Sequence, residues 1–281
     1  MTELDPLANR KRSATPAIAK VVLVVEALAL EHRLTGIARR TGLPASTVHR
    51  VLRELTSLGW VRESDEHDYD LGARLLSLVS RVTDESDVVR AARPILQDLC
   101  ERTGRTIHLG LREGDRAVYV EKLDGRQTYQ MRSRIGLPIP LHSTAIGKAL
   151  LAQLSDGEIR AIAERTGLPA YTARTITDVA RLLTKLRQVR ALGFAVDDEE
   201  NEVHTRCIGA VVFDHRGVPV GGLSLSSLAF DLDADHVRQY APLVVKAARD
   251  VSAALGAATE AVRPSPSTAP LPVATARPKG R

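Results

Sequence analysis

The chain has 281 residues, of which 44% are hydrophobic and 26% charged, so one or two folded cores are expected and a disordered protein is excluded. No apolar run approaches the roughly 18 to 20 residues of a membrane helix, and the N-terminus lacks a signal-peptide pattern. We therefore expect no membrane partner and a cytoplasmic location. The two cysteines, Cys100 and Cys207, lack the spacing of a disulfide framework or a cysteine zinc site.

The net charge of +5 is unevenly distributed along the chain. Residues 1–62 hold ten Lys or Arg against five Asp or Glu, and residues 263–281 hold four basic residues and no acidic one. A basic first segment favours nucleic-acid binding, because it displaces counterions from phosphates. A solvated surface and a flexible tail would account for the same charges.

The first two helices are predicted from apolar spacing and from capping residues. Thr15 is the expected N-cap of a helix that begins at Pro16. Its apolar residues, spaced by three and four positions, are Ile18, Val21, Val22, Val25 and Ala29. Thr35 should cap a short second helix, Gly36–Arg40, which Gly42 ends because glycine readily adopts a left-handed conformation.

A third helix is predicted within Leu43–Leu55, where apolar residues recur at i, i+3, i+4 and i+7. Its buried face should consist of Val48, Val51, Leu52 and Leu55. Its outward side chains are short hydroxyls followed by longer cations: Ser46, Thr47, His49, Arg50 and Arg53. Such a helix can read base edges and hold phosphates in the major groove. A three-helix core with a merely polar surface is the alternative.

Two short strands, 60–62 and 69–71, follow the third helix and enclose an acidic turn. Three helices and a two-stranded ribbon predict a winged helix-turn-helix domain over residues 15–73. The acidic tip of the wing should add little affinity for DNA. The residues that we predict to contact DNA are Thr35, Arg39, Ser46, Thr47, His49, Arg50 and Arg53.

These segments resemble the isocitrate-lyase-regulator (IclR) family of bacterial transcription factors. The resemblance rests on Leu43-Pro44-x-Ser46-Thr47-Val48-His49-Arg50-x-Leu52, Leu58-Gly59-Trp60-Val61 and Tyr69-x-Leu71-Gly72. It continues through Leu141–Ala149, Arg174–Thr177, Gly193–Glu200, Arg206–Ala210 and Leu223–Ser226, and so spans residues 16–257.

The rest of the chain predicts a linker and a second domain of the α+β class. Residues 74–86 should form a linker helix, and 88–102 a second helix; such a helix could pair with its copy in a dimer. Strands are predicted at 106–111, 117–121, 127–133, 193–196, 208–214 and 219–226. Helices are predicted near 144–154, 155–166, 178–192 and 233–255. An antiparallel sheet flanked by helices is expected, a GAF-like effector-binding domain over residues 87–258.

In the family that the chain resembles, a small carboxylic or aromatic acid binds in this domain. Carried over residue by residue, the resemblance implies effector contacts from the backbone of Ala145 and Ile146 and from Asp197, Cys207, Ser224 and Ser226. Helix N–H groups attract carboxylates, and two serines two positions apart on a strand share one face. Ile146 is bulkier than the usual small residue there, which predicts a narrower pocket.

Two other kinds of site are suggested by residue type. Asp197–Glu200, with His204 and Cys207, has metal-binding residue types, but consecutive carboxylates cannot all converge on one ion, so no metal or other cofactor is predicted. His142, Ser143 and Cys207 would suit a hydrolase. No nucleophile-elbow motif accompanies them, so no enzyme activity is expected.

The sequence is therefore interpreted as a DNA-binding transcriptional regulator, preferably a repressor, whose operator binding a small organic acid modulates. A homodimer reading a palindrome, able to pair into a tetramer, is implied by the resemblance. The alternatives are a metabolic enzyme, or a constitutive DNA-binding protein with a vestigial sensor. Residues 1–14 are expected to be flexible, and the Pro-rich basic tail 259–281 disordered.

Overall fold

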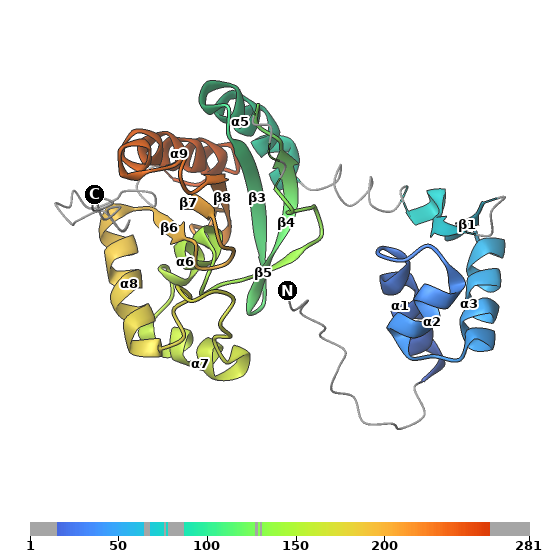
Figure 1. Cartoon of the computed structure of the whole chain (residues 1–281). Helices are drawn as coiled ribbons and strands as arrows, with labels where there is room; N and C mark the ends of the chain where they lie inside the picture. The colour runs from blue at the N-terminus through green and yellow to red at the C-terminus, as the bar shows by residue number, and fades with distance from the viewer. Residues whose placement is uncertain are drawn as a thin grey trace, which may run out of the picture. The chain divides into compact units, whose positions relative to one another are not determined.

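The protein is described by a computed structural model for residues 16–64, 68–75, 77, 87–126, 129 and 131–258. Contacts divide it into two compact units, one within residues 1–83 and one within 84–281 (Figure 1). The segments predicted as a flexible N-terminus, 1–14, and as a tail, 259–281, lie outside the described residues, as does most of the predicted linker helix, 74–86.

The first unit is a winged helix-turn-helix, as predicted. Its elements are α1 (Ala17–Leu28), α2 (Leu34–Thr41), α3 (Ala45–Ser57), β1 (Val61–Glu63) and β2 (Tyr69–Leu71). The two strands pair antiparallel, with Val61 opposite Leu71. The predicted buried face of α3 is confirmed, since Val48, Val51, Leu52 and Leu55 all lie in the core of this unit.

The buried face of α1 differs from the predicted one. Val24, Ala27 and Leu28 are buried, whereas Ile18 is 80% exposed and Val22 49% exposed. Because α1 is apolar on almost every side, residue spacing alone fitted more than one face. The predicted stripe therefore lies partly in the core and partly on the surface.

The start of α2 also differs from the prediction, while its end agrees. The N-cap is Arg33, which makes no side-chain capping bond, and Thr35 lies inside the helix rather than at its cap. Gly42 ends the helix with a left-handed φ of 68°, as expected.

The second unit is an α+β domain. Its elements are α5 (Asp87–Thr103), β3 (Thr106–Glu113), β4 (Arg116–Leu123), β5 (Pro138–Pro140), α6 (Ala145–Leu151), α7 (Asp156–Thr166), α8 (Val179–Leu192), β6 (Ala195–Asp198), β7 (Thr205–Phe213), β8 (Pro219–Leu228) and α9 (Ala234–Ala254). Six strands form one antiparallel sheet in the order β5-β4-β3-β8-β7-β6.

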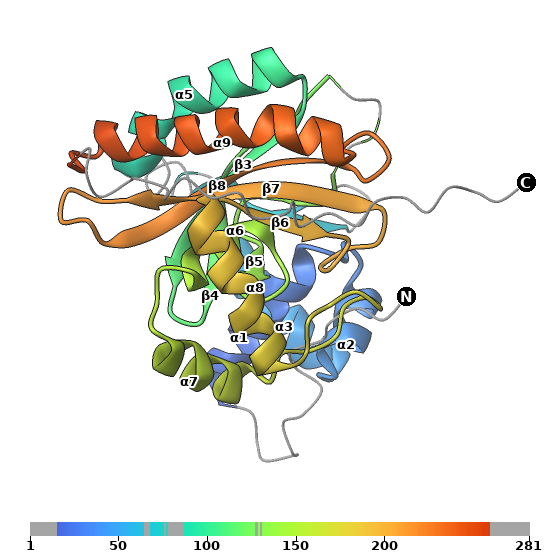
Figure 2. The same cartoon turned by 90° about the vertical axis from the view of Figure 1, so that its left-hand side faces the viewer.

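Helices cover both faces of this sheet (Figures 1 and 2). The amphipathic helices α5 and α9 pack together on one face, where they share a core with β3, β7 and β8. α6, α7 and α8 lie on the other face, around a second core. The sheet is thus the middle layer, and side chains alternate along each strand between the two cores.

One predicted strand is wrong. The described residues of the segment 127–133, Tyr129 and Met131–Ser133, are not in a strand, and the edge strand is instead β5, which pairs with Arg116–Val118. Pro138 and Pro140 lack the N–H that a central strand needs. An edge strand tolerates them, because one side of it has no neighbour.

No helix in the described part of the chain is long and apolar enough to cross a membrane.

Candidate functional site

The outward face of α3 carries five of the seven side chains predicted to contact DNA. Ser46, His49, Arg50 and Arg53 are exposed, and Thr47 is half-buried. Arg50 and Arg53 form no ion pair with any residue that the structure describes. Their guanidinium groups are therefore free to meet phosphates or base edges.

Neighbouring elements offer fewer unpaired cations. Arg39 on α2 is exposed but lies 3.8 Å from the carboxylate of Glu31. On the wing, Arg62 donates to Asp70 over 3.1 Å, and residues 65–67 of the predicted acidic tip lie outside the described residues. Thr35 is exposed on the first turn of α2. Arg50 and Arg53 on α3 are thus accompanied by Arg40 on α2, a further exposed cation without an ion pair among the described residues.

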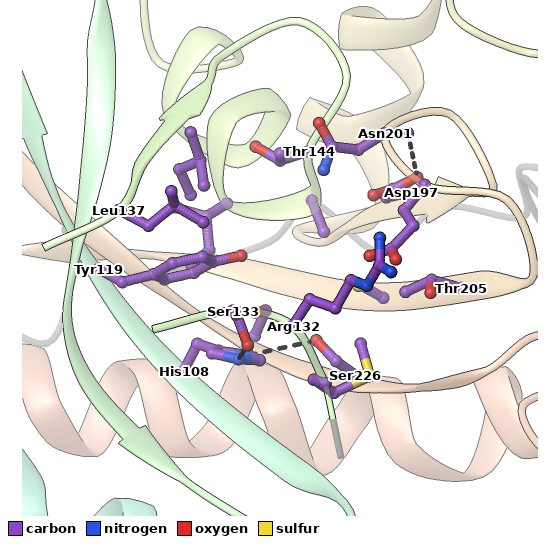
Figure 3. Close-up of a pocket in the computed structure, with 17 residues that line it drawn as sticks. His108, Tyr119, Arg132, Ser133, Leu137, Thr144, Asp197, Asn201, Thr205 and Ser226 are labelled. Carbon is purple, nitrogen blue, oxygen red and sulfur yellow. Dashed lines mark hydrogen bonds between the residues drawn. The ribbon is translucent and has the colours of Figure 1, made fainter. Parts of the chain in front are cut away.

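The second unit contains a cavity of about 110 Å³ between the sheet and α6 (Figure 3). All six residues that the resemblance implied for effector binding line it: Ala145, Ile146, Asp197, Cys207, Ser224 and Ser226. They come from α6, β6, β7 and β8, which are far apart in the sequence.

Strand register brings the polar members of this set together. Asp197 lies opposite Cys207, and Cys207 opposite Ser226, across three adjacent strands. On the next pair of strands, His108 lies opposite Ser224. A row of polar side chains therefore crosses the sheet under α6.

Glycines allow α6 to lie close enough to the sheet to roof the cavity. A Cβ on Gly209 would lie 2.7 Å from the carbonyl carbon of Ala145, and one on Gly147 would overlap the backbone of Leu141. Thr144 caps α6 by accepting a hydrogen bond from the N–H of Gly147 over 3.0 Å. The first residues of α6 are thereby held at the cavity wall.

Ile146 narrows the cavity and is itself accommodated by glycines. Its Cδ1 would lie 3.3 Å from a Cβ on Gly110, and its Cγ2 3.3 Å from one on Gly222. The bulkier side chain therefore packs over strand positions that have no side chain of their own. The small volume of the cavity agrees with the narrow pocket expected from the sequence.

Sequence reasoning missed several side chains that line the same cavity. His108 lies at 2.6 Å from Ser133 and 3.3 Å from Ser226, and its ring packs 4.7 Å from that of Tyr119 (Figure 3). Burial lowers the pKa of His108 to about 3, so its ring is neutral. A histidine within an otherwise apolar buried strand was the signal that could have revealed it.

Arg132 also lines the cavity, and it was not predicted either. It is exposed and makes no hydrogen bond or ion pair with the residues that the structure describes. Its side chain extends toward Asp197 in Figure 3. The lining of the cavity therefore includes an exposed cation without a partner among the described residues, in the segment predicted as a strand.

Asp197 is the principal ionisable group inside the cavity. Its Oδ1 accepts hydrogen bonds from the N–H groups of Glu200, over 2.8 Å, and Asn201, over 3.3 Å. Burial raises the pKa of Asp197 to about 7, although the nearby Lys148 opposes this shift. Burial also raises the pKa of Cys207 and of Tyr119, so both side chains are neutral.

The raised pKa of Asp197 predicts a pH-dependent stability. Because the folded state favours the protonated carboxyl, the stabilisation is complete below the usual pKa of 3.8 and is lost as the pH rises through about 7. Between about pH 6.5 and pH 8 we expect Asp197 to contribute a loss of roughly 1 kcal/mol in the free energy of unfolding, as the difference between the wild type and a variant without this carboxyl. Chemical denaturation at a series of pH values measures it.

Asp197→Asn is the matched variant, because its amide oxygen still accepts both backbone hydrogen bonds. It should remove most of this pH dependence. Burial lowers the pKa of His108 and of His142, whose opposite effect on stability near their usual value of 6.5 is present in both proteins. The difference between the two pH profiles therefore isolates Asp197. If the free energy of unfolding depended equally on pH in the wild type and in Asp197→Asn, the pH dependence could not be assigned to Asp197.

The acidic run that suggested a metal site is divided among separate partners. Asp198 accepts from Arg206 over 2.6 Å, Glu199 pairs with Arg174 over 3.2 Å, and Glu200 pairs with Lys148. Among the described residues no group of three or more His, Cys, Asp or Glu could hold a metal ion.

The residues that suggested a hydrolase are likewise engaged elsewhere. The Nε2 of His142 lies 3.0 Å from the carbonyl oxygen of Pro169, and the hydroxyl of Ser143 donates to Asn201 over 3.0 Å. The imidazole and this hydroxyl therefore do not form a nucleophile–base pair.

Comparisons with known proteins match both units. The family model described as IclR helix-turn-helix domain matches residues 17–65, and the one described as Bacterial transcriptional regulator IclR C-terminal matches residues 80–253. The chain is 36% identical over 251 residues to the HTH-type transcriptional regulator KdgR of Escherichia coli K12, covering 88% of this chain and 95% of that protein.

Two further relatives extend the comparison. The chain is 32% identical over 226 residues to the Transcriptional repressor IclR of Escherichia coli K12, covering 79% of this chain and 82% of that one. A crystal structure of an IclR homologue from Microbacterium hydrocarbonoxydans, complexed with 4-hydroxybenzoate, superposes with a TM-score of 0.74 at 23% identity, covering 85% and 99% of the two chains. At this level of identity, the match to the 4-hydroxybenzoate complex shows a shared fold and nothing further.

Proposed function

Because the chain belongs to the IclR family and is a DNA-binding transcriptional regulator, we propose that a small carboxylic acid in the cavity of its second unit controls its binding to an operator. The observation that carries this proposal is the convergence of six separately implied residues on one cavity. We further propose that it acts as a repressor in the cytoplasm and has no catalytic activity. The similar relatives are named as regulators or repressors, which supports this.

The size and polarity of the cavity favour a short acid. An apolar cavity of about 150 Å³ holds benzene, so about 110 Å³ suits a ligand of that size or smaller. The cation of Arg132 would attract a carboxylate, and the hydroxyls of Ser224 and Ser226 would donate to it. A carboxylate close to Asp197 would raise the pKa of that residue further, so Asp197 would bind as a protonated donor.

Control of DNA binding requires that the acid binds the DNA-competent and incompetent states with different affinities. A panel of short carboxylic acids is screened by thermal shift on the full-length protein, and each hit is tested for its effect on DNA affinity. Ser224→Ala should leave DNA affinity within about twofold and weaken the response to the acid by about tenfold.

Thr184→Ala, which removes an exposed hydroxyl from α8, is the matched control and should respond normally. A normal response in Ser224→Ala would argue against the cavity as the effector site. Conversion of the acid into a product would instead favour the enzyme alternative.

We also propose that the regulator is a homodimer and that the exposed side of α1 forms part of its interface. Ile18 and Val22 lie one turn apart and present a continuous apolar edge that the first unit does not bury. A two-fold pair of recognition helices would read both halves of a palindrome. Association into a dimer of dimers is a further prediction from the family resemblance.

The double variant Ile18→Glu, Val22→Glu should be monomeric in sedimentation velocity, because four carboxylates would face each other in the dimer. Its DNA affinity should fall at least about tenfold, since the second half-site is lost. Glu54→Gln, at an exposed position on α3, should stay dimeric. A dimeric double variant would exclude this surface from the interface.

A further inference from the structure

The second unit has another concave site, on the opposite face of the sheet from the cavity. This groove, of about 390 Å³, lies between α9 and the segment that leads from α8 into the edge strand β6. Figure 2 shows α9 running along the sheet on the side away from α6. The groove shares no lining residue with the cavity, and its volume falls within the range of roughly 300 to 1,000 Å³ typical of ligand pockets.

The floor of the groove is apolar and continuous with the protein core. Leu192, Phe194, Ala241, Pro242 and Val245 form it. Phe194 and Ala241 are buried in the core cluster under α9, and Leu192 and Val245 pack against that cluster. The floor is therefore rigid and offers apolar surface to a bound molecule.

Three cations border this apolar floor. Arg238, Lys246 and Arg249 recur on α9 at intervals of eight and three residues, which places them along one side of the helix. Arg238 and Lys246 each pair with an exposed acid on the same helix, Asp235 and Asp250, over 2.5 Å. Such exposed pairs are weak and compete poorly with a bound anion.

Arg249 differs from the other two cations. Its Nε is buried and has no hydrogen-bond partner among the residues that the structure describes. A buried N–H without an acceptor is costly, and most such groups in native proteins are paired. An acceptor from outside the described residues would satisfy this N–H.

We propose that this groove binds an amphipathic carboxylate, whose hydrocarbon part lies on the apolar floor and whose carboxylate accepts from Arg249. Arg238 and Lys246 add attraction at the rim. This site is distinct from the effector cavity, and its existence does not depend on the function proposed for that cavity.

The charge of the groove favours a carboxylate over two other possible occupants, the C-terminal segment of the chain and a second copy of the protein. The C-terminal segment 259–281 holds four basic residues and one acidic residue, so its excess of positive charge does not complement Arg249, the cation without an acidic partner in the described part of the chain. If a second copy packed on the groove about a two-fold axis, its Arg238, Lys246 and Arg249 would face the same three residues of the first copy. Like charges would then meet in that interface. A carboxylate with an apolar chain matches both the floor and the rim.

Octanoate is the probe, and octanol, which has the same chain without the charge, is its control. Each is titrated calorimetrically into the full-length protein without DNA. We expect saturable binding of octanoate, at one site per chain, and at least about tenfold weaker binding of octanol. Arg249→Gln should weaken octanoate binding by about tenfold or more, since a hydrogen bond to a charged group is lost.

Two other variants make the result specific. Lys246→Gln, which changes an exposed side chain and should fold normally, is expected to weaken binding by roughly two- to fivefold. Arg165→Gln, on α7 at the other face of the sheet, should leave binding unchanged.

Three outcomes would overturn the proposal. Octanoate binding that Ser224→Ala weakens and Arg249→Gln does not would place the ligand in the cavity. The absence of saturable binding at millimolar octanoate would mean that the groove is not a carboxylate site. A change of sedimentation coefficient in Arg249→Gln without octanoate would identify a second copy as the occupant.

Discussion

Replacing Lys148 with methionine should lower the free energy of unfolding by about 3–5 kcal/mol, because it leaves the carboxylate of Glu200 as an uncompensated buried charge. Lys148 is fully buried on α6, and its Nζ pairs with Oε1 of Glu200, which is itself buried. The other carboxylate oxygen of Glu200 already lacks a hydrogen-bond partner among the described residues. Denaturant unfolding followed by circular dichroism measures the change.

Lys246→Met is the matched control, because Lys246 forms an exposed pair with Asp250 on α9. The same substitution should cost about 0.5 kcal/mol or less there. Combining Lys148→Met with Glu200→Leu should restore most of the stability, since removing both charges leaves neither one unpaired. A loss of less than about 1 kcal/mol in Lys148→Met would show that the pair contributes little.

Lys148→Met should also change the pKa of Asp197 in the cavity. The charge of Lys148 lowers the pKa of Asp197, in opposition to burial. Without that charge the pKa of Asp197 should rise above its value of about 7, and the pH-dependent loss of stability should move to higher pH. Lys148 therefore links the fold of this unit to the protonation state of the candidate effector site.

Replacing Arg50 with alanine should weaken binding to the preferred operator by roughly 5- to 150-fold, the equivalent of about 1–3 kcal/mol for one base-reading side chain. Arg50 is exposed on α3, one turn after Ser46, and has no ion-pair partner among the described residues. Its loss should leave stability unchanged, because the core of the first unit does not include it.

The operator is first selected from a random pool of DNA duplexes with the wild-type protein. Fluorescence anisotropy at fixed salt then compares the selected duplex with an unrelated one. Arg50→Ala should lose affinity for the selected duplex more than for the unrelated one, because a base contact carries specificity. Arg165→Ala, in the second unit, should bind both duplexes as the wild type does.

A purely phosphate-binding role for Arg50 would give a different result. Both affinities would then fall equally, and the dependence of affinity on salt would become shallower. An unchanged affinity for the selected duplex would remove Arg50 from the DNA interface altogether.

The local sequence pattern predicted the buried residues of a helix correctly where only one face of that helix is apolar. On α3 the buried residues agree with the prediction, because the period of 3.6 residues brings Val48, Val51, Leu52 and Leu55 to one side whatever the rest of the chain does. Gly42 ends α2 for an equally local reason, its left-handed backbone conformation. The same pattern failed on α1, where apolar residues on several sides fitted more than one buried face.

The family resemblance predicted site residues that local periodicity could not, because it implied residues that are distant from one another in the sequence. It implied Asp197, Cys207, Ser224 and Ser226, which the structure brings into one cavity. It did not supply Arg132, which lies in a segment that was misassigned as a strand.

The sequence by itself thus determined the fold class, the buried face of α3 and the family, since these depend on periodicity, on turn residues and on recurring motifs. The tertiary structure alone decided that His108, Tyr119 and Arg132 share a cavity with the implied residues, and that Lys148 pairs with Glu200. It also decided which side of α1 is left exposed. The physical reason is that strand register and helix packing join residues separated by dozens of positions, and no local period encodes those contacts.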